Sequence, residues 1–455
     1  MIAPLSLKSL QHEFAWELVG ANCSFDAVSI DSRTLQPGDL YVALVGEHFD
    51  GHDFIEIAIA QGACAVLSSK KLAIAVPQLI VDDTRLGLAL LANTVRQQFG
   101  GLLIGLTGSA GKTTVKEMLA AIFSVKGGVL ATKGNLNNEI GVPLTLLQLD
   151  QSHDYAVIEM GARGPGDIHY LSQITSPDIA LLLNAKPVHL DGMGSVEGVA
   201  QTKGEIFENL SSKCHAIVNL DDDFAGFWQQ RIDTAQIVTF GLKAGADVSA
   251  ANIELGAESV KFDLLINDQT EVVNLAVAGA HNVTNALAAA AVTSAAGLSI
   301  REIAQGLDTF SGVDSRLNRS DGINGSLVID DSYNANPEAM MAAIDVLAVQ
   351  PGNHILVVGD MGELGEKAAQ YHFEIGQYAK QHKVSRLIAV GELSRHVIKG
   401  FGDNGEWFSS QQELISSLIS SIKASDVVLV KGSRSAAMEN VVIKIKNPSN
   451  DLVGD

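Results

Sequence analysis

A glycine-rich segment between a strand-like run and a helix-like run has residue types and spacing that suit phosphate binding. The sequence LLIGLTGSAGKTTVKEMLAAIF places this turn directly after the apolar residues 102–106. Backbone N–H groups of 108–112 can bind phosphate oxygens at a helix N-terminus, the Lys112 ammonium adds a point charge, and the Thr113 hydroxyl can bind Mg²⁺. The residues of this phosphate loop are Thr107, Gly108, Ser109, Ala110, Gly111, Lys112 and Thr113.

The phosphate loop is a variant of the usual pattern. The strict G-x-x-x-x-G-K-[ST] pattern requires a glycine where Leu106 stands, and this loop opens on Thr107 instead. Such a loop predicts a nucleotide site but leaves ATPases, GTPases, kinases and ligases open. The class of protein therefore depends on where the other polar residues fall.

Six polar residues follow predicted strands directly or within one residue. Ligands of open α/β sheets bind outside the carboxyl ends of the strands, so this placement predicts that the six side chains lie around a ligand. Any one of them alone is compatible with an ordinary surface turn. The six are Thr107, Glu159, Asn184, Asp330, Asp360 and Lys431.

Three side chains outside the loop could assist phosphate chemistry. Glu159 ends the apolar run 155–158, where a carboxylate on a second strand would reach Mg²⁺ beside the loop. His189 follows the next strand-like run and could bind a second metal ion, although an isolated histidine is more often structural. Lys203 lies in the stretch TKGEIFENL, which by itself is typical of a solvated helix.

The elements that position these residues follow an α/β pattern, in which β-branched runs alternate with Gly- or Asp-bearing turns and Ala/Leu-rich helical stretches. Four runs in the central part predict a mostly parallel, buried sheet, at 102–106, 155–158, 179–183 and 216–218. Four later runs predict an open doubly wound unit, at 327–329, 355–358, 387–390 and 427–430. In that unit Asn336 is the expected N-cap of a helix that begins at Pro337.

The length of 455 residues favours about three domains, each able to bury its own core. Short apolar runs near the N-terminus suffice for a small α/β domain, and they lie at 40–45, 63–67 and 79–81. Helices predicted at 282–296 and 301–307 end before the Gly-, Ser- and Asp-rich stretch SGVDSRLNRSDGING. We therefore expect domains at 1–84, 85–312 and 313–455.

The charge balance limits the partners. The chain has 31 Lys and Arg against 52 Asp and Glu, a formal charge of −21, so we expect no nucleic-acid partner and no binding to an anionic membrane. It has no run of 18 apolar residues and no signal-peptide pattern at its start, so we expect no membrane insertion and a cytoplasmic location. The three cysteines, Cys23, Cys64 and Cys214, are isolated and predict neither a zinc site nor a disulfide framework.

Several segments together resemble the Mur ligase family, the ATP-dependent ligases of peptidoglycan synthesis. They are TGSAGKTT, KGNLNNEIGVPLTLL, IEMGARGPGDI, KGEIF, HNVTNALAA, DDSYNANPEAM, GDMGELG and KGSR. The resemblance runs from about Ser29 to Arg434. It implies an α/β fold of three domains: a small UDP-sugar-binding domain, a central, mostly parallel-sheet ATPase domain with a phosphate loop, and a C-terminal Rossmann-like, doubly wound domain.

The resemblance also implies roles for individual residues. Uridine-nucleotide contacts would be Ser29, Asp31, Ser32 and Arg33, and contacts to the muramoyl substrate would be Asn137 and Asn138. One Mg²⁺ would bind Thr113 and Glu159, the other His189. Lys203 matches a lysine that is carbamylated in some Mur ligases, and it would then also bind metal. ATP contacts outside the phosphate loop would be Asn282, Asn285, Arg316, Asp330, Tyr333, Asn334 and Asn336.

The implied reaction joins D-alanyl-D-alanine to UDP-N-acetylmuramoyl-tripeptide through an acyl phosphate, with ATP and Mg²⁺ as cofactors and with Lys112, Lys203, His189, Glu159 and Arg316 as catalytic residues. We expect a monomer. The alternatives are a ligase that adds the third amino acid, a folylpolyglutamate-synthetase-like ligase, and a regulatory nucleotide switch without ligase activity. The D-N-P-R motif of the diaminopimelate-adding ligase is absent, since the corresponding turn reads NANP.

The chain departs from the family pattern at one position. The resemblance leads us to expect a glycine just before Arg316, the arginine that follows the second domain boundary, but this chain has Ser315 there. We therefore expect a difference in backbone geometry at this hinge rather than a different activity.

Overall fold

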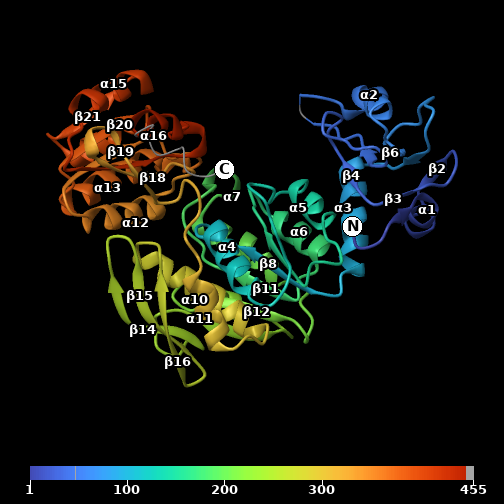
Figure 1. Cartoon of the computed structure of the whole chain (residues 1–455), viewed down its shortest axis with the longest axis horizontal. Helices are drawn as coiled ribbons and strands as arrows, with labels where there is room; N and C mark the ends of the chain where they lie inside the picture. The colour runs from blue at the N-terminus through green and yellow to red at the C-terminus, as the bar shows by residue number, and fades with distance from the viewer. Residues whose placement is uncertain (47, 447–455) are drawn as a thin grey trace.

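The computed structural model describes residues 1–46 and 48–446. Figure 1 shows three bodies, with the N-terminal part in blue, the central part in cyan to yellow, and the C-terminal part in orange to red. Each body is built around its own sheet, and the three sheets are mostly parallel. The predicted α/β fold with three domains is thereby confirmed as a fold class. In the described residues no helix combines the length and the apolar character that a membrane span requires.

The N-terminal body contains a five-stranded sheet in the order β2-β7-β6-β5-β4, in which only β2 runs antiparallel, and a two-stranded pair of β1 and β3. Its strands are β1 (Leu5–Ser6), β2 (Glu17–Val19), β3 (Ser24–Phe25), β4 (Val28–Ser29), β5 (Leu40–Val42), β6 (Ala65–Ser68) and β7 (Gln78–Ile80). Its helices are α1 (Leu7–Phe14) and α2 (Ile55–Ala60), with a 3-10 turn at Gly51–Phe54.

The helix α3 (Thr84–Gln98) connects the N-terminal and central bodies. It packs against β6 on one side and against α5 (Gly141–Leu146) and α6 (Asp167–Thr175) on the other. Asp83 caps its start by accepting hydrogen bonds from the backbone amides of Arg85 and Leu86. Its buried side chains join one continuous apolar core that extends from the N-terminal sheet to one face of the central sheet.

Arg96, near the end of α3, is an anchor for this connection. Its guanidinium donates to the carbonyls of Thr175 and Ser176 and to the Asp178 carboxylate, each at 2.9–3.0 Å. We expect Arg96→Met to lower the free energy of unfolding by about 3 kcal/mol, because it leaves the carbonyls of Thr175 and Ser176 without this donor, whereas Asp178 keeps the Leu103 amide. Urea unfolding measures this.

The matched control is Arg85→Met at the other end of the same helix. Within the described part of the chain the Arg85 side chain pairs with Asp83 alone, and both side chains are about half exposed, at 53% and 50%. Exposed pairs of this kind contribute about 0–1 kcal/mol, so this variant is expected to unfold nearly as the parent does. Equal losses in the two variants would contradict the anchoring role of Arg96.

The central body contains a nine-stranded sheet in the order β16-β15-β14-β13-β12-β11-β8-β10-β9. Its parallel part consists of β8 (Leu102–Thr107), β9 (Val129–Ala131), β10 (Tyr155–Glu159), β11 (Ile179–Leu182), β12 (His215–Asn219) and β13 (Gln236–Phe240). One face is covered by α4 (Lys112–Phe123), α10 (Ala280–Ala295) and α11 (Ile300–Asp308). The other face packs against α3, α5, α6 and α8 (Val196–Gly204). The remaining helices are α7 (Leu190–Met193), α9 (Ala225–Gln229) and a 3-10 turn at Glu205–Phe207.

The central sheet continues into three strands that pair antiparallel with one another and that were not predicted from the sequence. They are β14 (Val248–Leu255), β15 (Val260–Ile266) and β16 (Gln269–Leu275). In β15 buried residues alternate with more exposed ones, and Asn267 and Asp268 at the following turn both have positive φ. This alternation around an Asn-Asp turn is a hairpin signal that could have been found in the sequence.

The C-terminal body contains a six-stranded sheet in the order β17-β18-β22-β19-β20-β21, in which only β17 is antiparallel. The strands are β17 (Asn318–Asp321), β18 (Leu327–Asp331), β19 (Asn353–Val358), β20 (Arg386–Val390), β21 (Gly405–Phe408) and β22 (Asp426–Lys431). One face packs against α12 (Pro337–Ala348), α13 (Ala368–Gln381) and α14 (Arg395–Phe401), the other against α15 (Gln411–Ser421) and α16 (Glu439–Ile445). Short 3-10 turns lie at Ile323–Gly325, Gly365–Lys367 and Arg434–Ala436.

The start of α12 is as predicted. The Asn336 side chain accepts a hydrogen bond from the backbone amide of Ala339 at 2.8 Å, and Pro337 occupies the first helical position. Because the cap and the proline are local signals, the sequence alone determines where this helix begins. This start lines a cavity between the central and C-terminal bodies.

Candidate active site

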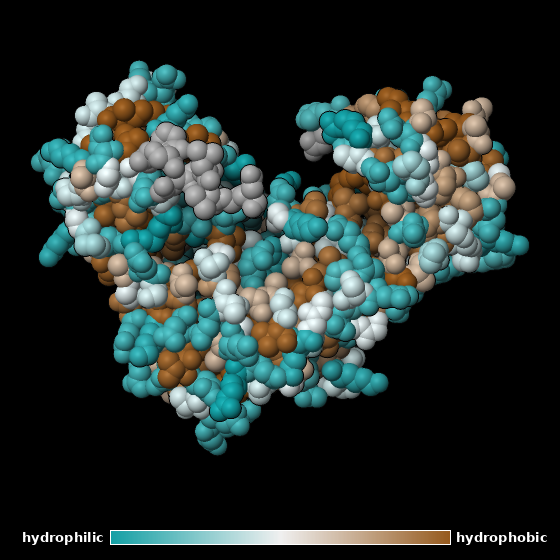
Figure 2. All heavy atoms as spheres, in the orientation of Figure 1, coloured by the Kyte–Doolittle hydropathy of each residue, from teal (hydrophilic) through white to brown (hydrophobic). Residues whose placement is uncertain are grey.

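A cavity of about 650 Å³ lies between the central and C-terminal bodies. Its walls include the start of α4, the segments that follow β10 and β11, the start of α10 and the start of α12. Figure 2 shows that the N-terminal body stands apart from the C-terminal body across an open hollow above the central body. The cavity is thus at the carboxyl ends of the central strands, where the sequence predicts a ligand.

The phosphate loop follows β8 and ends where α4 begins at Lys112. Gly111 has φ +84°, and a Cβ there would lie 2.5 Å from Oδ1 of Asn285, so this position requires glycine. A Cβ at Gly108 would lie 2.8 Å from that of Leu183. The Lys112 ammonium donates to the Gly108 carbonyl at 2.7 Å, and burial lowers its pKa. The lysine therefore lies folded over the loop.

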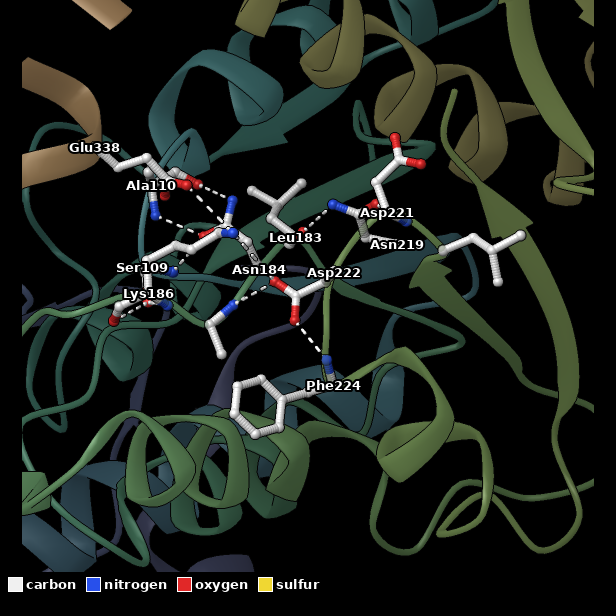
Figure 3. A network of polar contacts seen from close by, with 12 residues as sticks. Ser109, Ala110, Leu183, Asn184, Lys186, Asn219, Asp221, Asp222, Phe224 and Glu338 are labelled. Atoms are coloured by element: carbon white, nitrogen blue, oxygen red, sulfur yellow. Dashed lines mark hydrogen bonds and ion pairs between the residues drawn. The ribbon is translucent and has the colours of Figure 1, made fainter. Parts of the chain in front are cut away.

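Asn184, two residues after β11, is hydrogen-bonded to the phosphate loop, as Figure 3 shows. Its Oδ1 accepts from the amides of Ser109 and Ala110 at 3.0 and 2.9 Å, and its Nδ2 donates to the Ala110 carbonyl at 3.1 Å. This corrects the expectation that these two amides bind phosphate, because in this structure they pair with Asn184. The amides that point out of the helix start at 111–113 are the donors in position for an anion.

Two of the loop residues do not line the cavity. Thr107 is fully buried, and its hydroxyl donates to the Met160 carbonyl at 2.9 Å. Gly108 is likewise outside the cavity wall, whereas residues 109–113 line it. Thr107 therefore fixes the loop to the neighbouring strand end instead of facing a ligand.

Glu159 and Thr113 meet as the sequence predicts. The Thr113 hydroxyl donates to one oxygen of the buried Glu159 carboxylate at 3.1 Å, and the Asn137 amide donates to the other at 2.8 Å. Mg²⁺ prefers oxygen ligands and keeps several waters and phosphate oxygens in its shell, so one hydroxyl and one carboxylate beside a phosphate loop fit it. In the described residues no group of three or more His, Cys, Asp or Glu side chains could hold a metal ion alone.

His189 lines the cavity but does not join Glu159 in a metal-binding group. Its Nδ1 pairs instead with the Glu363 carboxylate from the C-terminal body, and its backbone has φ +50° at the start of α7. The contact occupies Nδ1 and leaves Nε2 as the ring nitrogen that could bind a metal ion, so His189 stays a predicted metal ligand.

Lys203, at the end of α8, is 1% exposed and lines the same cavity. Burial, assisted by the positive charge of Lys112, holds the pKa of Lys203 well below its usual range. Among the residues that the structure describes, its ammonium has no hydrogen-bond or ion-pair partner. A buried, unpaired lysine amine differs from the solvated helix residue that its local sequence suggests, and the lowered pKa favours the neutral form that carbamylation requires.

Arg316 reaches into the phosphate loop from the C-terminal side. Its guanidinium donates to the Thr113 hydroxyl at 3.1 Å and lies over the Tyr333 ring at 4.5 Å. Ser315, the predicted departure, has φ +56°, in the left-handed region that favours glycine. A glycine would adopt this backbone conformation without strain, which explains why one is expected there. Serine adopts it at a cost of about 1 kcal/mol.

Asn282 and Asn285, two of the predicted ATP contacts, form a short network at the start of α10. The Asn285 amide donates to the Asn282 oxygen at 3.0 Å, and the Asn282 amide donates to the Ala278 carbonyl at 2.8 Å. Both asparagines line the cavity, as do Tyr333, Asn334 and Asn336.

Asp330 is an exception among the predicted nucleotide contacts, because it does not line the cavity. Its carboxylate accepts from the Ser332 hydroxyl at 2.6 Å and from Ser315 at 3.4 Å. The next residue, Asp331, faces the cavity and pairs with Lys431 at 2.5 Å. Both aspartates lie at the end of β18, so their sequence positions do not show which of them faces the cavity. Successive side chains of a strand point to opposite faces, and only one of the two can point into it.

The predicted uridine-binding residues lie in the N-terminal body, in and after β4, and none of them lines the cavity. Arg33 has an 86% exposed side chain that pairs with Asp31 at 2.7 Å, and this pairing lowers the pKa of Asp31 to about 2. Ser29 and Ser32 lie in the same turn. The predicted muramoyl contacts Asn137 and Asn138 do line the cavity.

His281 lines the cavity beside Asn282, and the sequence alone predicts no role for it. Burial, with a contribution from the Lys431 charge, lowers its pKa to about 4. Because the unfolded histidine titrates near 6.5, the unfolded chain binds the proton first as the pH falls. The contribution of the neutral His281 side chain to the free energy of unfolding is therefore present above about pH 6.5 and is lost as the pH falls towards 4.

We expect a His281→Asn variant to lack this pH-dependent part. Urea unfolding at pH 7 and at pH 5 gives the free energy of unfolding of the parent and of the variant at each pH. The parent should lose more stability than the variant between the two pH values. A difference that stays constant with pH would contradict the lowered pKa.

The fold and the cavity together define a class: a phosphate-loop protein in which a second α/β body covers the loop and supplies an arginine to it. Three regions match Mur ligase domains: the Mur ligase family catalytic domain at 24–96, the Mur ligase middle domain at 106–293, and the Mur ligase glutamate ligase domain at 315–434. The chain belongs to the Mur ligase family.

Individual relatives agree over nearly the whole chain. The UDP-N-acetylmuramoyl-tripeptide–D-alanyl-D-alanine ligase of Escherichia coli K12 is 45% identical over 96% of this chain and 97% of its own length. A crystal structure of MurF from Acinetobacter baumannii is similar with a TM-score of 0.93 and 37% identity, covering 97% of this chain and 98% of the other. MurF of Thermotoga maritima in complex with ADP has a TM-score of 0.84 and 30% identity, covering 92% and 96%.

Proposed function

We propose that this chain joins D-alanyl-D-alanine to UDP-N-acetylmuramoyl-tripeptide, with conversion of ATP to ADP and phosphate, and so supplies the pentapeptide precursor for peptidoglycan synthesis. The observation that carries this proposal is the contact of Arg316 with Thr113, because it joins the C-terminal body to the phosphate loop around one cavity. The similarity over nearly the whole chain to a ligase of that name supports the choice of substrates.

The reaction has two steps. The terminal carboxylate of the tripeptide attacks the γ-phosphorus of ATP, the bond to the β–γ bridging oxygen breaks, and ADP leaves. The amine of D-alanyl-D-alanine then attacks the acyl phosphate carbonyl, loses a proton and expels phosphate. Both reactants of the first step are anions, so cations and N–H donors around the transferred phosphoryl group carry most of the catalysis.

The residues of this chain divide these tasks. Lys112 donates to the Gly108 carbonyl and Arg316 to the Thr113 hydroxyl, so both cations are at the loop, where they offset the phosphate charge. Thr113 and Glu159 would hold Mg²⁺, which supplies additional positive charge at the phosphates when bound. Closure of the C-terminal body over the loop would exclude water, which would otherwise hydrolyse the acyl phosphate.

Phosphate release, measured with and without each substrate, tests this proposal. We expect sustained release only when ATP, the tripeptide and D-alanyl-D-alanine are all present. Equal release without the dipeptide would favour the nucleotide switch, and release supported by diaminopimelate or lysine on a dipeptide acceptor would favour the ligase that adds the third residue. Either result would contradict the proposal.

We also propose the domain boundaries 1–84, 85–312 and 313–455, and a monomer in solution. The first boundary falls at the start of α3, and the second falls between α11 and β17. Ser29, Asp31, Ser32 and Arg33 remain the proposed uridine contacts, which requires the N-terminal body to present them across the hollow seen in Figure 2.

A further inference from the structure

Lys186 forms an ion pair between two bodies at the rim of the cavity. It lies on the segment that follows β11, and its ammonium is 3.2 Å from the Glu338 carboxylate in the first turn of α12. The side chains are 30% and 43% exposed. Figure 3 shows Glu338 reaching from the C-terminal body towards this segment.

The backbone of Lys186 is bound to the phosphate loop. Its amide donates to the Ser109 hydroxyl at 2.9 Å, and that hydroxyl lies 3.3 Å from the Lys186 carbonyl. Two residues earlier, Asn184 binds the amides of Ser109 and Ala110. The segment that carries Lys186 is therefore hydrogen-bonded directly to the phosphate loop, so a displacement of this segment would also displace the loop.

A buried carboxylate keeps Lys186 in place. Asp222, whose side chain is 1% exposed, lies 4.0 Å from the Lys186 ammonium. Its oxygens accept from the amides of Ala185 and Phe224 at 3.0 and 2.9 Å, which fixes its position. Together Asp222 and Glu338 raise the pKa of Lys186, against the effect of burial, so it is charged at neutral pH.

We propose that Lys186 is a positioning residue, which holds the start of α12 over the phosphate loop through Glu338. The proposal rests on the proposed ligase function, which requires the C-terminal body to cover the loop. Arg319 and Gln350 also join these bodies, through Ala257 and Glu258 at the turn between β14 and β15. The contacts of Arg316 and His189 join them too, but both belong to residues with predicted catalytic roles. Lys186 has no such role, so it can bias closure without taking part in phosphoryl transfer.

A double-mutant cycle tests this pairing. The variants are Lys186→Met, Glu338→Gln and the double variant, and the measured quantities are kcat and the KM for ATP. We expect each single variant to lower kcat/KM about fivefold, as for a partly exposed ion pair, and the double variant to be no worse than either single one. Losses that multiply to about 25-fold in the double variant, or an unaffected Glu338→Gln variant, would overturn the proposal.

Two further variants serve as controls. Lys186→Arg keeps the charge and is expected to retain most of the activity. Lys71→Met breaks an exposed ion pair with Glu17 inside the N-terminal body, with side chains 63% and 56% exposed, and is expected to act as the parent does. A Lys186→Arg variant as impaired as Lys186→Met would indicate a direct contact with the nucleotide and overturn the positioning role.

Small-angle X-ray scattering with and without ADP gives a readout that is independent of turnover. We expect Lys186→Met and Glu338→Gln to show a larger radius of gyration than the parent with ADP, and an unchanged unfolding midpoint. An unchanged radius in both variants would overturn the proposal. If the parent itself shows no ligase turnover, the proposed function fails while the scattering result still tests the pairing.

Discussion

Replacing Lys112 with alanine is expected to abolish ADP formation, with a loss in kcat of about a thousandfold or more. The Lys112 ammonium lies over the phosphate loop within 2.7 Å of the Gly108 carbonyl, and burial lowers its pKa because the site offers it little water. In such a site a fixed cation acts with little screening on the charge that develops during phosphoryl transfer. The measurement is ADP production with all three substrates present.

Binding of the UDP substrate should survive this change. The proposed uridine contacts are in the N-terminal body, outside the cavity that Lys112 lines. Calorimetric titration with UDP-N-acetylmuramoyl-tripeptide is expected to give nearly the parent affinity. The matched control is Lys126→Ala, which removes a half-exposed lysine three residues after the end of α4 and is expected to leave turnover intact. Full turnover in Lys112→Ala would exclude the loop from catalysis.

The second large effect is expected at Lys203. A Lys203→Ala variant should be inactive and should recover part of its activity in short-chain carboxylic acids such as formate or acetate. The lysine is 1% exposed, and burial together with the Lys112 charge holds its pKa well below the usual range. A neutral amine can take up CO₂, which turns it into a carboxylate-like group that offsets the neighbouring positive charges.

Lys203→Met separates the roles of shape and charge. Methionine has a similar length but no nitrogen, so it fills the space of the side chain without leaving room for an added acid. We expect it to be inactive and not to be rescued, while its unfolding midpoint stays close to that of the parent. Absence of rescue in Lys203→Ala would leave the lysine with a structural role only, and full activity in either variant would contradict the prediction.

His189 and Asp330 make contacts that their positions in the sequence do not predict. Both follow predicted strands, which is the correct region of the fold. His189 nevertheless pairs with Glu363 from another body, and Asp330 bonds to Ser332 and Ser315 while its neighbour Asp331 faces the cavity. Two properties depend on tertiary packing and cannot be read from local sequence patterns. They are the face of the sheet to which a strand-end side chain points, and the residues of another body that it contacts.

By itself the sequence determined the phosphate loop, the start of α12, the α/β fold and the meeting of Thr113 with Glu159. These depend on local spacing, on capping residues and on the rule that parallel strands end at one edge of a sheet. Only the tertiary structure decided that Asn184 binds the loop amides, that Lys203 is buried without a partner, and that Lys186 pairs with Glu338. The reason is that these properties belong to residues far apart in the chain, which become neighbours only when three sheets have packed.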